Sequence, residues 1–321
     1  MRQLTVTSSE EGRRIDKYIL KYLNTAPSSF VYKLLRKKNV KLNSKRANGE
    51  EVLKKGDVVE IYLSETAFEN FRKEDTKDTP LGIKGNIDII YEDENVLFVN
   101  KKAGILTQRD KSGDPSLNDN ILFYLKDSIE PSFKPSVCNR LDRNTSGIVT
   151  AGKNLEALRE LSCIFADKKA EKIYLALVWG VLKSPSVLEL YHTKDKNNKV
   201  RVTKEKREGA SFVRTYFEPI HINEEENITL LRLRLDTGKS HQIRASLSHI
   251  SHPIIGDRKY SREDINQKYR KLFGLKDQFL HAYNLSFRTE GKLSYLNDKV
   301  FKAPLPKQLE NIVKYFNINI E

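Results

Sequence analysis

The stretch Arg140–Gly147, which reads RLDRNTSG, is the most informative part of this 321-residue chain. It places the carboxylate of Asp142 between the guanidinium groups of Arg140 and Arg143, and opposite charges within a few ångströms favour the ionised form of a carboxylate. Its Thr-Ser-Gly end predicts a turn into the apolar strand Ile148–Ala151, and such a loop can present a side chain at a cleft. From the spacing alone a surface cluster of ion pairs is the better explanation, so other motifs have to decide.

Further motifs follow in order between Ile90 and Pro306. They are IYEDENVLFVNK with a later Ala-Gly (90–104), KIYLA with a later glycine (172–180), TGKSHQIR (237–244), HPIIGD with a later tyrosine (252–260), LHA (280–282) and APLP (303–306). Together with RLDRNTSG they resemble the RluA-type pseudouridine synthases, whose signature is H-R-L-D-R-[DN]-T-S-G. Several motifs in the family's order are far more specific than any one of them.

The resemblance implies an enzyme that isomerises uridine to pseudouridine in RNA. Such an enzyme cuts the glycosidic bond, rotates the uracil and rejoins it through a ring carbon. This reaction involves no net redox change, so we expect no cofactor. The sequence agrees, because it contains no GxGxxG after a strand, no GxxxxGK[ST] and no Cys-x-x-Cys pair.

The resemblance also implies roles for four residues. Asp142 matches the catalytic aspartate, which acts as nucleophile or base at the ribose; the sequence leaves both roles open. Arg244 matches the basic residue that pairs with that aspartate and would keep it charged in a cleft that excludes water. Tyr174 matches the active-site tyrosine, which can stack on the uracil and meet the departing ring proton; an ordinary strand aromatic is its alternative. Arg140 matches the position that fills the stack vacated by a flipped base and holds phosphate.

Three histidines and two departures from the family pattern qualify this prediction. His241, His249 and His252 lack a fourth ligand at metal spacing, so we expect hydrogen-bonding roles and no metal site. The family usually has His where Asn139 stands and Pro where Lys102 stands. Neither position is among those assigned to the chemistry, so these departures put in doubt only the support of the site and the choice of substrate. The charged segment 261–278 is predicted to be an insertion of unknown role.

The composition favours an RNA partner. The chain has 57 Lys and Arg against 43 Asp and Glu, a formal charge of +14, which attracts polyanions through counterion release and steering. Charge alone would fit a solvated basic surface equally well. No apolar run approaches the length of a membrane span, the N-terminus lacks a signal-peptide pattern, and the two cysteines, both expected to be buried, form no disulfide framework. These features predict a cytoplasmic protein without a membrane partner.

Residues 1–64 are predicted to form a small module. Apolar residues recur at helical spacing over 13–23, a second helix follows Pro27 with Ser28 as candidate N-cap, and strands are expected near 40–42 and 58–63. This order resembles the alpha-L RNA-binding module. Seven cations that could follow a phosphate backbone are Lys33, Arg36, Lys37, Lys38, Lys41, Lys45 and Arg46. An exposed basic helix without a ligand is the alternative. Residues 65–86 show no hydrophobic period and are predicted to be a linker.

Residues 87–321 are predicted to form an α+β domain. Strands are expected at 87–91, 96–100, 148–151, 173–178, 212–217, 229–235 and 280–287, and helices at 155–165, 243–250 and 309–316. Many strands with a few helices indicate a large mixed, mostly antiparallel sheet, and the family implies the same sheet with an RNA-binding cleft.

The combination of this domain with the alpha-L module resembles the RluC- and RluD-type members and predicts a monomer that acts on large-subunit ribosomal RNA. A synthase for transfer RNA is one alternative. A non-catalytic RNA-binding or ribosome-assembly protein is another, although the joint presence of Asp142, Tyr174 and Arg244 argues against it.

Overall fold

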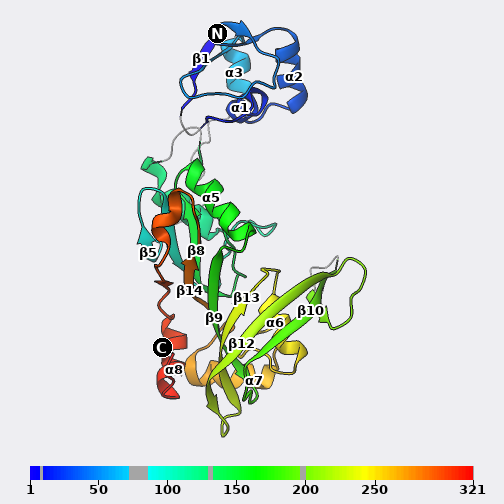
Figure 1. Cartoon of the computed structure of the whole chain (residues 1–321), viewed down its shortest axis with the longest axis vertical. Helices are drawn as coiled ribbons and strands as arrows, with labels where there is room; N and C mark the ends of the chain where they lie inside the picture. The colour runs from blue at the N-terminus through cyan, green and yellow to red at the C-terminus, as the bar shows by residue number, and fades with distance from the viewer. Residues whose placement is uncertain (8–9, 72–85, 129–132, 196–199, 321) are drawn as a thin grey trace. The chain divides into compact units, whose positions relative to one another are not determined.

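The structure is a computed structural model, and it describes residues 1–7, 10–71, 86–128, 133–195 and 200–320 (Figure 1). The chain forms two compact units. The first consists of Met1–Gly82 with the short segments Lys126–Lys134 and Asn154–Glu156; the second consists of Ile83–Leu125, Pro135–Lys153 and Ala157–Glu321.

The first unit contains a four-stranded sheet in the order β1-β4-β2-β3. Its strands are β1 (Arg2–Thr5), β2 (Val40–Leu42), β3 (Lys45–Arg46) and β4 (Val58–Ile61), and its first two helices are α1 (Ile15–Tyr22) and α2 (Ser28–Arg36). Ile15, Tyr18 and Ile19 are fully buried, because their spacing places them on one face of α1. The two predicted helices are confirmed. The prediction that Ser28 caps α2 is wrong, since Ser28 is already helical and the extended Pro27 precedes it without a side-chain cap.

The predicted linker begins as a helix, α3 (Glu65–Phe71). Phe68 is 2% exposed within the core of the first unit, and the ring of Phe71 lies 4.2 Å from that of Phe30. The core therefore continues to Phe71, beyond the predicted boundary at 64. Two aromatic residues one turn apart are too short a pattern to predict a helix. The rest of the predicted linker, up to residue 85, lies outside the described residues.

The second unit is built on an eleven-stranded sheet. The path runs β11-β10-β12-β13-β9-β14-β8-β6-β5, with β15 on β14 and β7 on β8. The strands are β5 (Ile89–Glu92), β6 (Val96–Lys101), β7 (Ser136–Val137), β8 (Ser146–Gly152), β9 (Ala170–Trp179), β10 (Ser186–Lys194), β11 (Val200–Thr203), β12 (Ser211–Asn223), β13 (Ile228–Leu235), β14 (Leu280–Phe287) and β15 (Phe301–Lys302). Only β14 and β8 run parallel among the described strand pairs. The predicted mixed, mostly antiparallel sheet is confirmed.

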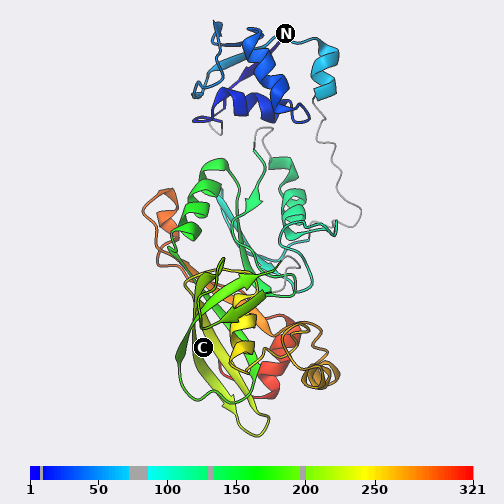
Figure 2. The same ribbon diagram turned by 90° about the vertical axis from the view of Figure 1, so that its right-hand side faces the viewer.

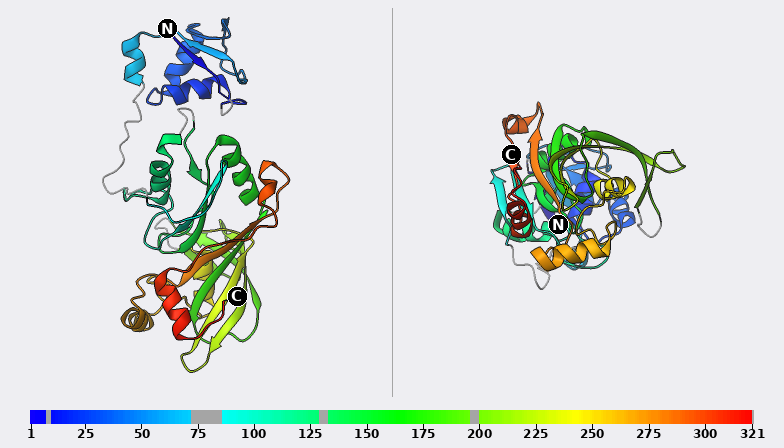
Figure 3. Two further views of the ribbon diagram at one scale, coloured as in Figure 1. Left: turned by 90° about the vertical axis from the view of Figure 1, so that its left-hand side faces the viewer. Right: turned by 90° about the horizontal axis from the view of Figure 1, so that it is seen from below.

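Helices cover this sheet in separate groups. They are α4 (Leu117–Tyr124), α5 (Leu155–Ala166), α6 (Gln242–His249), α7 (Glu263–Phe273) and α8 (Lys307–Tyr315), with the 3-10 turn η2 (Lys292–Leu296). Another 3-10 turn, η1 (Lys126–Ser128), belongs to the first unit. Helix α5 shares a core with β6, β14 and η2, and Figure 3 shows α5 next to the η2 segment. Helices α7 and α8 contact each other (Figure 2) and share a core with β13. No described helix has the length and apolar character needed to cross a membrane.

The parallel junction of β8 and β14 places the RLDRNTSG loop. Gly147 has a φ of +114°, and a Cβ there would collide with the carbonyl oxygen of Ala282 on β14, so the close approach of the two strands requires glycine. The turn comprises residues 142–145 and so lies before the predicted Thr-Ser-Gly turn at 145–147. The amide of Thr145 donates to the carbonyl of Asp142 at 3.0 Å, and Ser146 already belongs to β8. Asp142 therefore lies in the loop that enters a fully buried strand.

The two cysteines are both free thiols. Cys138 is half-buried beside β7, whereas Cys163 on α5 is exposed, so the prediction of burial is wrong for Cys163.

Candidate active site

A pocket of about 300 Å³ in the second unit brings the four expected site residues together. Its lining combines the loop before β8, strand β9 and the start of α6: Cys138, Asn139, Arg140, Leu141, Asp142, Thr145, Phe165, Lys172, Tyr174, Leu235, Gly238, Lys239, His241, Gln242, Ile243, Arg244 and Leu280. Residues separated by more than a hundred positions thus meet in one hollow of one unit.

The partner of Asp142 is Arg244, as the resemblance implied. Nη1 of Arg244 donates to Oδ2 of Asp142 at 2.9 Å. The two arginines adjacent in sequence do not pair with it, so the expectation from local spacing is wrong. Arg143 binds Asp114 at 2.8 Å instead, and the exposed Arg140 forms no ion pair with any residue that the structure describes. Neighbours along an extended loop point in different directions, and tertiary packing supplies the counter-ion.

Arg244 is held from its other side by Asp257, which the sequence did not single out for any role. Nε and Nη2 of Arg244 donate to the two carboxylate oxygens of Asp257 at 2.7 and 2.9 Å. Asp257 is fully buried. Burial opposes the charge of the guanidinium, but the hydrogen bond and charge of Asp257, together with Asp142, raise the pKa of Arg244 above its ordinary value. The bidentate clamp leaves Nη1 directed at Asp142.

Segment 261–278 now has a structural role, because α7 supports the turn that carries Asp257. The side chain of Asn266 is 2% exposed. It accepts from the amide of Gly256 at 2.8 Å and donates to the carbonyl of Asp257 at 3.1 Å. A buried amide with both ends bonded fixes the position of the turn. In the sequence, Asp257 is the last residue of the HPIIGD motif, which indicates the family but gives no role for this aspartate.

Tyr174 lies on β9 between Leu233 of β13 and Ala282 of β14. Its side chain lines the pocket and the residue is 7% exposed. Burial and the nearby charge of Asp142 raise the pKa of the Tyr174 phenol, so the hydroxyl keeps its proton at neutral pH. A neutral aromatic ring at the floor of a small pocket can pack a planar base.

His241 is a pocket residue that was expected only to form hydrogen bonds. It adopts a left-handed backbone conformation with φ 54° at the start of α6. Its Nδ1 lies 3.0 Å from the hydroxyl of Tyr260, and its Nε2 lies 3.9 Å from Oδ2 of Asp142. Burial lowers the pKa of His241 and raises that of Tyr260 to about 12, which favours a neutral pair. Of the other histidines, His252 contacts the carbonyl of Trp179 at 3.1 Å.

Two residues, Lys101 and Asn139, stabilise the loop that carries Asp142 through hydrogen bonds to backbone groups. Lys101 is 1% exposed, and its ammonium donates to three carbonyl oxygens, those of Lys102, Ile105 and Arg143, at 2.8–2.9 Å. Asn139 accepts from the amide of Thr150 at 2.8 Å and donates to the carbonyl of Ile148 at 3.2 Å. Asn139, where the family usually has His, therefore connects the loop to β8. Lys102, where the family usually has Pro, is exposed.

The basic segment, residues 33–46, lies at the end of α2 and on the β2–β3 hairpin. Six of its seven cations are exposed, Lys41 being half-buried. None of the seven forms an ion pair with a residue of the described ranges. Lys41 stands between Arg46 on β3 and Glu60 on β4, so it faces one like and one opposite charge across the sheet.

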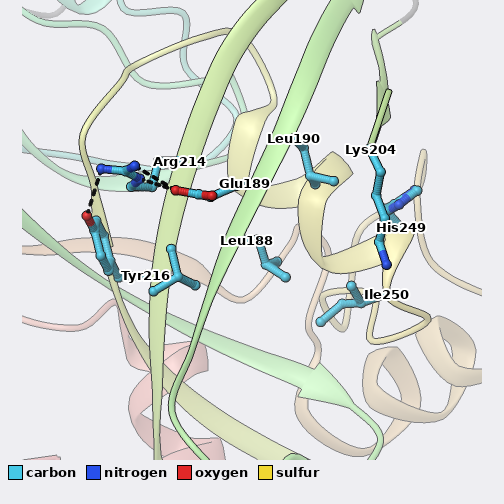
Figure 4. A pocket seen from close by; sticks show the side chains of 9 residues that line it. Leu188, Glu189, Leu190, Lys204, Arg214, Tyr216, His249 and Ile250 are labelled. Carbon is cyan, nitrogen blue, oxygen red and sulfur yellow. Dashed lines mark hydrogen bonds and ion pairs between the residues drawn. The ribbon is translucent and has the colours of Figure 1, made fainter. Parts of the chain in front are cut away.

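A larger hollow, of about 680 Å³, lies beside β10 (Figure 4). Figure 4 shows Arg214, Glu189 and Tyr216 on one side of the strands and Lys204, His249 and Ile250 on the other. Arg214 is already paired with Glu189 and Asp236. None of the expected catalytic residues lines this hollow.

Comparisons with known proteins identify the family of this chain. The family described as RNA pseudouridylate synthase matches residues 95–249. An uncharacterized RNA pseudouridine synthase of Mycoplasma genitalium is 33% identical over 88% of each chain. The ribosomal large subunit pseudouridine synthase C of Haemophilus influenzae is 32% identical over 98% of this chain and 94% of its own length. The solved structure of human RNA pseudouridylate synthase domain containing 4 shares the fold, with a TM-score of 0.58 and 20% identity over 73% of this chain and 94% of that one. The chain is a member of the RNA pseudouridine synthase family.

Proposed function

We propose that this enzyme converts specific uridines of large-subunit ribosomal RNA to pseudouridine, with Asp142 as the reacting carboxylate. The observation that carries the proposal is the Asp142–Arg244–Asp257 arrangement beside Tyr174. A carboxylate held by a clamped guanidinium stays ionised and oriented in a small pocket. The choice of ribosomal RNA is supported by the relative named ribosomal large subunit pseudouridine synthase C, which matches almost the whole chain.

We infer different roles for the two oxygens of Asp142 from their hydrogen bonds. Arg244 bonds only Oδ2, so Oδ1 is the oxygen available to act at the ribose, as nucleophile or as base. Tyr174 packs the uracil while it rotates. Burial raises the pKa of its phenol, so the phenol stays neutral and contributes as a hydrogen-bonding group. The proton that leaves the ring carbon after rejoining passes to a base, either the carboxylate of Asp142 once it is free again or water. Arg140, exposed at the rim and unpaired within the described residues, enters the stack from which the uridine has been flipped.

Domain roles complete the proposal. Residues 87–321 carry the catalysis, and the N-terminal module binds RNA through the basic segment. The four expected site residues all line one pocket of a single chain, which supports the further proposal that the enzyme works as a monomer. Its ribosomal substrate would place it in the cytoplasm.

The test is a map of pseudouridines in total RNA from cells with and without this protein. Sites in large-subunit ribosomal RNA should disappear on deletion and return with the wild-type gene. If only pseudouridines of transfer RNA disappeared, the proposed substrate would be wrong and the proposed activity would be retained. An unchanged map, together with defective ribosome assembly, would favour the non-catalytic alternative.

A further inference from the structure

Lys172 stands out among the charges of the active-site pocket because nothing in the described structure neutralises it. It lies on β9 two residues before Tyr174, so both side chains face the same side of the sheet, and both line the pocket. It is half-buried, yet its ammonium has neither a carboxylate nor a hydrogen-bond acceptor among the residues described. Burial lowers the pKa of Lys172.

The immediate surroundings of this ammonium leave one side open. Nζ lies 5.5 Å from the centre of the Phe165 ring, which covers it by a cation–π contact. On another side Nζ would be 3.9 Å from a Cβ built on Gly238, so the glycine at this position leaves free space next to the charge. Phe165, Gly238 and Lys172 all line the pocket. The free space therefore opens where the substrate binds.

A comparison with Lys101 shows why this arrangement indicates a ligand. Lys101 is the more deeply buried of the two, and all three of its N–H groups are bonded to carbonyl oxygens. Lys172 is half-buried, so its side chain loses part of its hydration without any such compensation, which costs free energy unless a bound group repays it. Lys101 thus has its hydrogen bonds made within the protein, whereas the ammonium of Lys172 has none to a described residue.

The charge balance of the pocket identifies the chemistry of the missing group. Its lining carries four cations, Arg140, Lys172, Lys239 and Arg244, against the single carboxylate of Asp142. Arg244 is committed to two carboxylates, and Arg140 and Lys239 are exposed to water. A partly desolvated ammonium binds an anion more strongly than a neutral carbonyl. In RNA the only anionic group is the phosphodiester.

We propose that Lys172 binds a phosphate of the RNA backbone next to the flipped uridine. This inference rests on the proposed function and extends it to a defined contact at the same site. Lys172 then fixes the reacting nucleotide by its backbone, while Asp142 and Tyr174 act on the ribose and the base. Its removal weakens capture of the nucleotide and leaves the chemical groups intact.

The test combines Lys172→Met with a scan of neutral phosphates. The substrate is a fragment of large-subunit ribosomal RNA that the wild-type enzyme binds, with one methylphosphonate at a time on either side of the target uridine. On the unmodified fragment, Lys172→Met should lose about 10- to 100-fold in kcat/KM, the value of one charge-assisted hydrogen bond. At one position the methylphosphonate should cost the wild type a similar factor and cost Lys172→Met nothing further. Lys172→Arg, which keeps the charge, should recover most of the loss.

Lys183→Met is the matched control, because Lys183 is exposed and already paired with Glu224. It should leave kcat/KM unchanged on every fragment. Thermal unfolding of Lys172→Met should match that of the wild type, since no described partner is lost; if Met is not tolerated, Lys172→Gln takes its place.

Additive losses at every methylphosphonate position would overturn the proposal and assign Lys172 to the base or to folding. The same holds if no neutral phosphate affects the wild type. Affinity for the fragments, measured alongside turnover, separates this inference from the proposed function. Coupling in affinity without any turnover would defeat the proposed activity and keep the phosphate contact, and turnover without coupling would do the reverse.

Discussion

The active-site pocket and the basic segment both contain several cations, but the main cation of the pocket is paired with carboxylates whereas those of the basic segment are not. In the pocket, the side chain of Arg244 is 9% exposed and is bonded to two carboxylates. In the basic segment, six of seven cations are exposed and none forms an ion pair with a described residue. A buried guanidinium persists only with its partners in place, so it is positioned for one geometry. Exposed cations without partners are available to any polyanion and make binding dependent on salt.

Among the variants that keep Asp142, the largest effect is expected for Arg244→Ala. Its removal takes the counter-ion from Asp142 and leaves Asp257 buried and unpaired. We expect kcat/KM to fall by about 10²- to 10³-fold or more, with reduced stability. Initial rates and thermal unfolding would be measured together. Arg232→Ala is the control, because Arg232 forms a more exposed pair with Glu218; an equal loss of activity there would contradict the assignment.

Asp257→Asn should separate positioning from direct contact. Asparagine keeps the shape but removes the charge that clamps Arg244, and breaking one side of a buried ion pair costs about 3–5 kcal/mol. We expect a lower free energy of unfolding and a lower kcat, because Nη1 is no longer held toward Asp142. Glu218→Gln, which removes a more exposed carboxylate paired with an arginine, should change neither. Normal turnover by Asp257→Asn would show that the clamp is dispensable.

Arg140→Ala should affect substrates unequally. If this side chain fills the vacated stack, its loss matters most when the target uridine must first be unstacked, a step worth a few kcal/mol. We expect a loss of roughly 10- to 100-fold on a structured helical fragment and a much smaller one when the uridine is already unpaired. Equal losses on both fragments would indicate a direct catalytic or folding role.

The smallest effect on turnover is expected in the basic segment. Replacing Lys41, Lys45 and Arg46 with Gln should flatten the dependence of log affinity on log salt by up to about 0.7–0.9 per lost phosphate contact. Turnover at saturating short substrate should be unchanged. Three paired and exposed cations of the second unit, Lys183, Lys268 and Lys314, provide the control triple. An unchanged slope would mean that the segment binds a partner other than RNA.

These two regions also differ in how far the sequence could predict them. The basic segment was predicted from local composition. Its helix and the strand at 40–42 were found where expected, whereas the short strand β3, which pairs with it, was not predicted. For the pocket, the resemblance predicted that Asp142 meets Arg244. Local spacing predicted the wrong arginines, because the direction of a side chain in a loop depends on tertiary packing. The role of Asp257 could not be read from the sequence for the same reason.

Two of the elements missed in the sequence, α7 and α3, share a physical cause. Helix α7 has a strongly charged sequence, EDINQKYRKLF, and buries Ile265, Asn266 and Tyr269 on one side. Too few of its residues are apolar to reveal the helical period. Helix α3 is held by two phenylalanines against a core formed elsewhere in the sequence. Both elements gain their stability from packing, which composition does not record.

The most direct test of the account is turnover by Asp142→Asn. Asparagine preserves size and can still accept from Arg244, but it cannot supply the ionised oxygen that acts at the ribose. The account predicts a loss of pseudouridine formation of about 10⁴-fold or more, with unchanged folding and unchanged affinity for the RNA fragment. Appreciable pseudouridine formation by Asp142→Asn would contradict it.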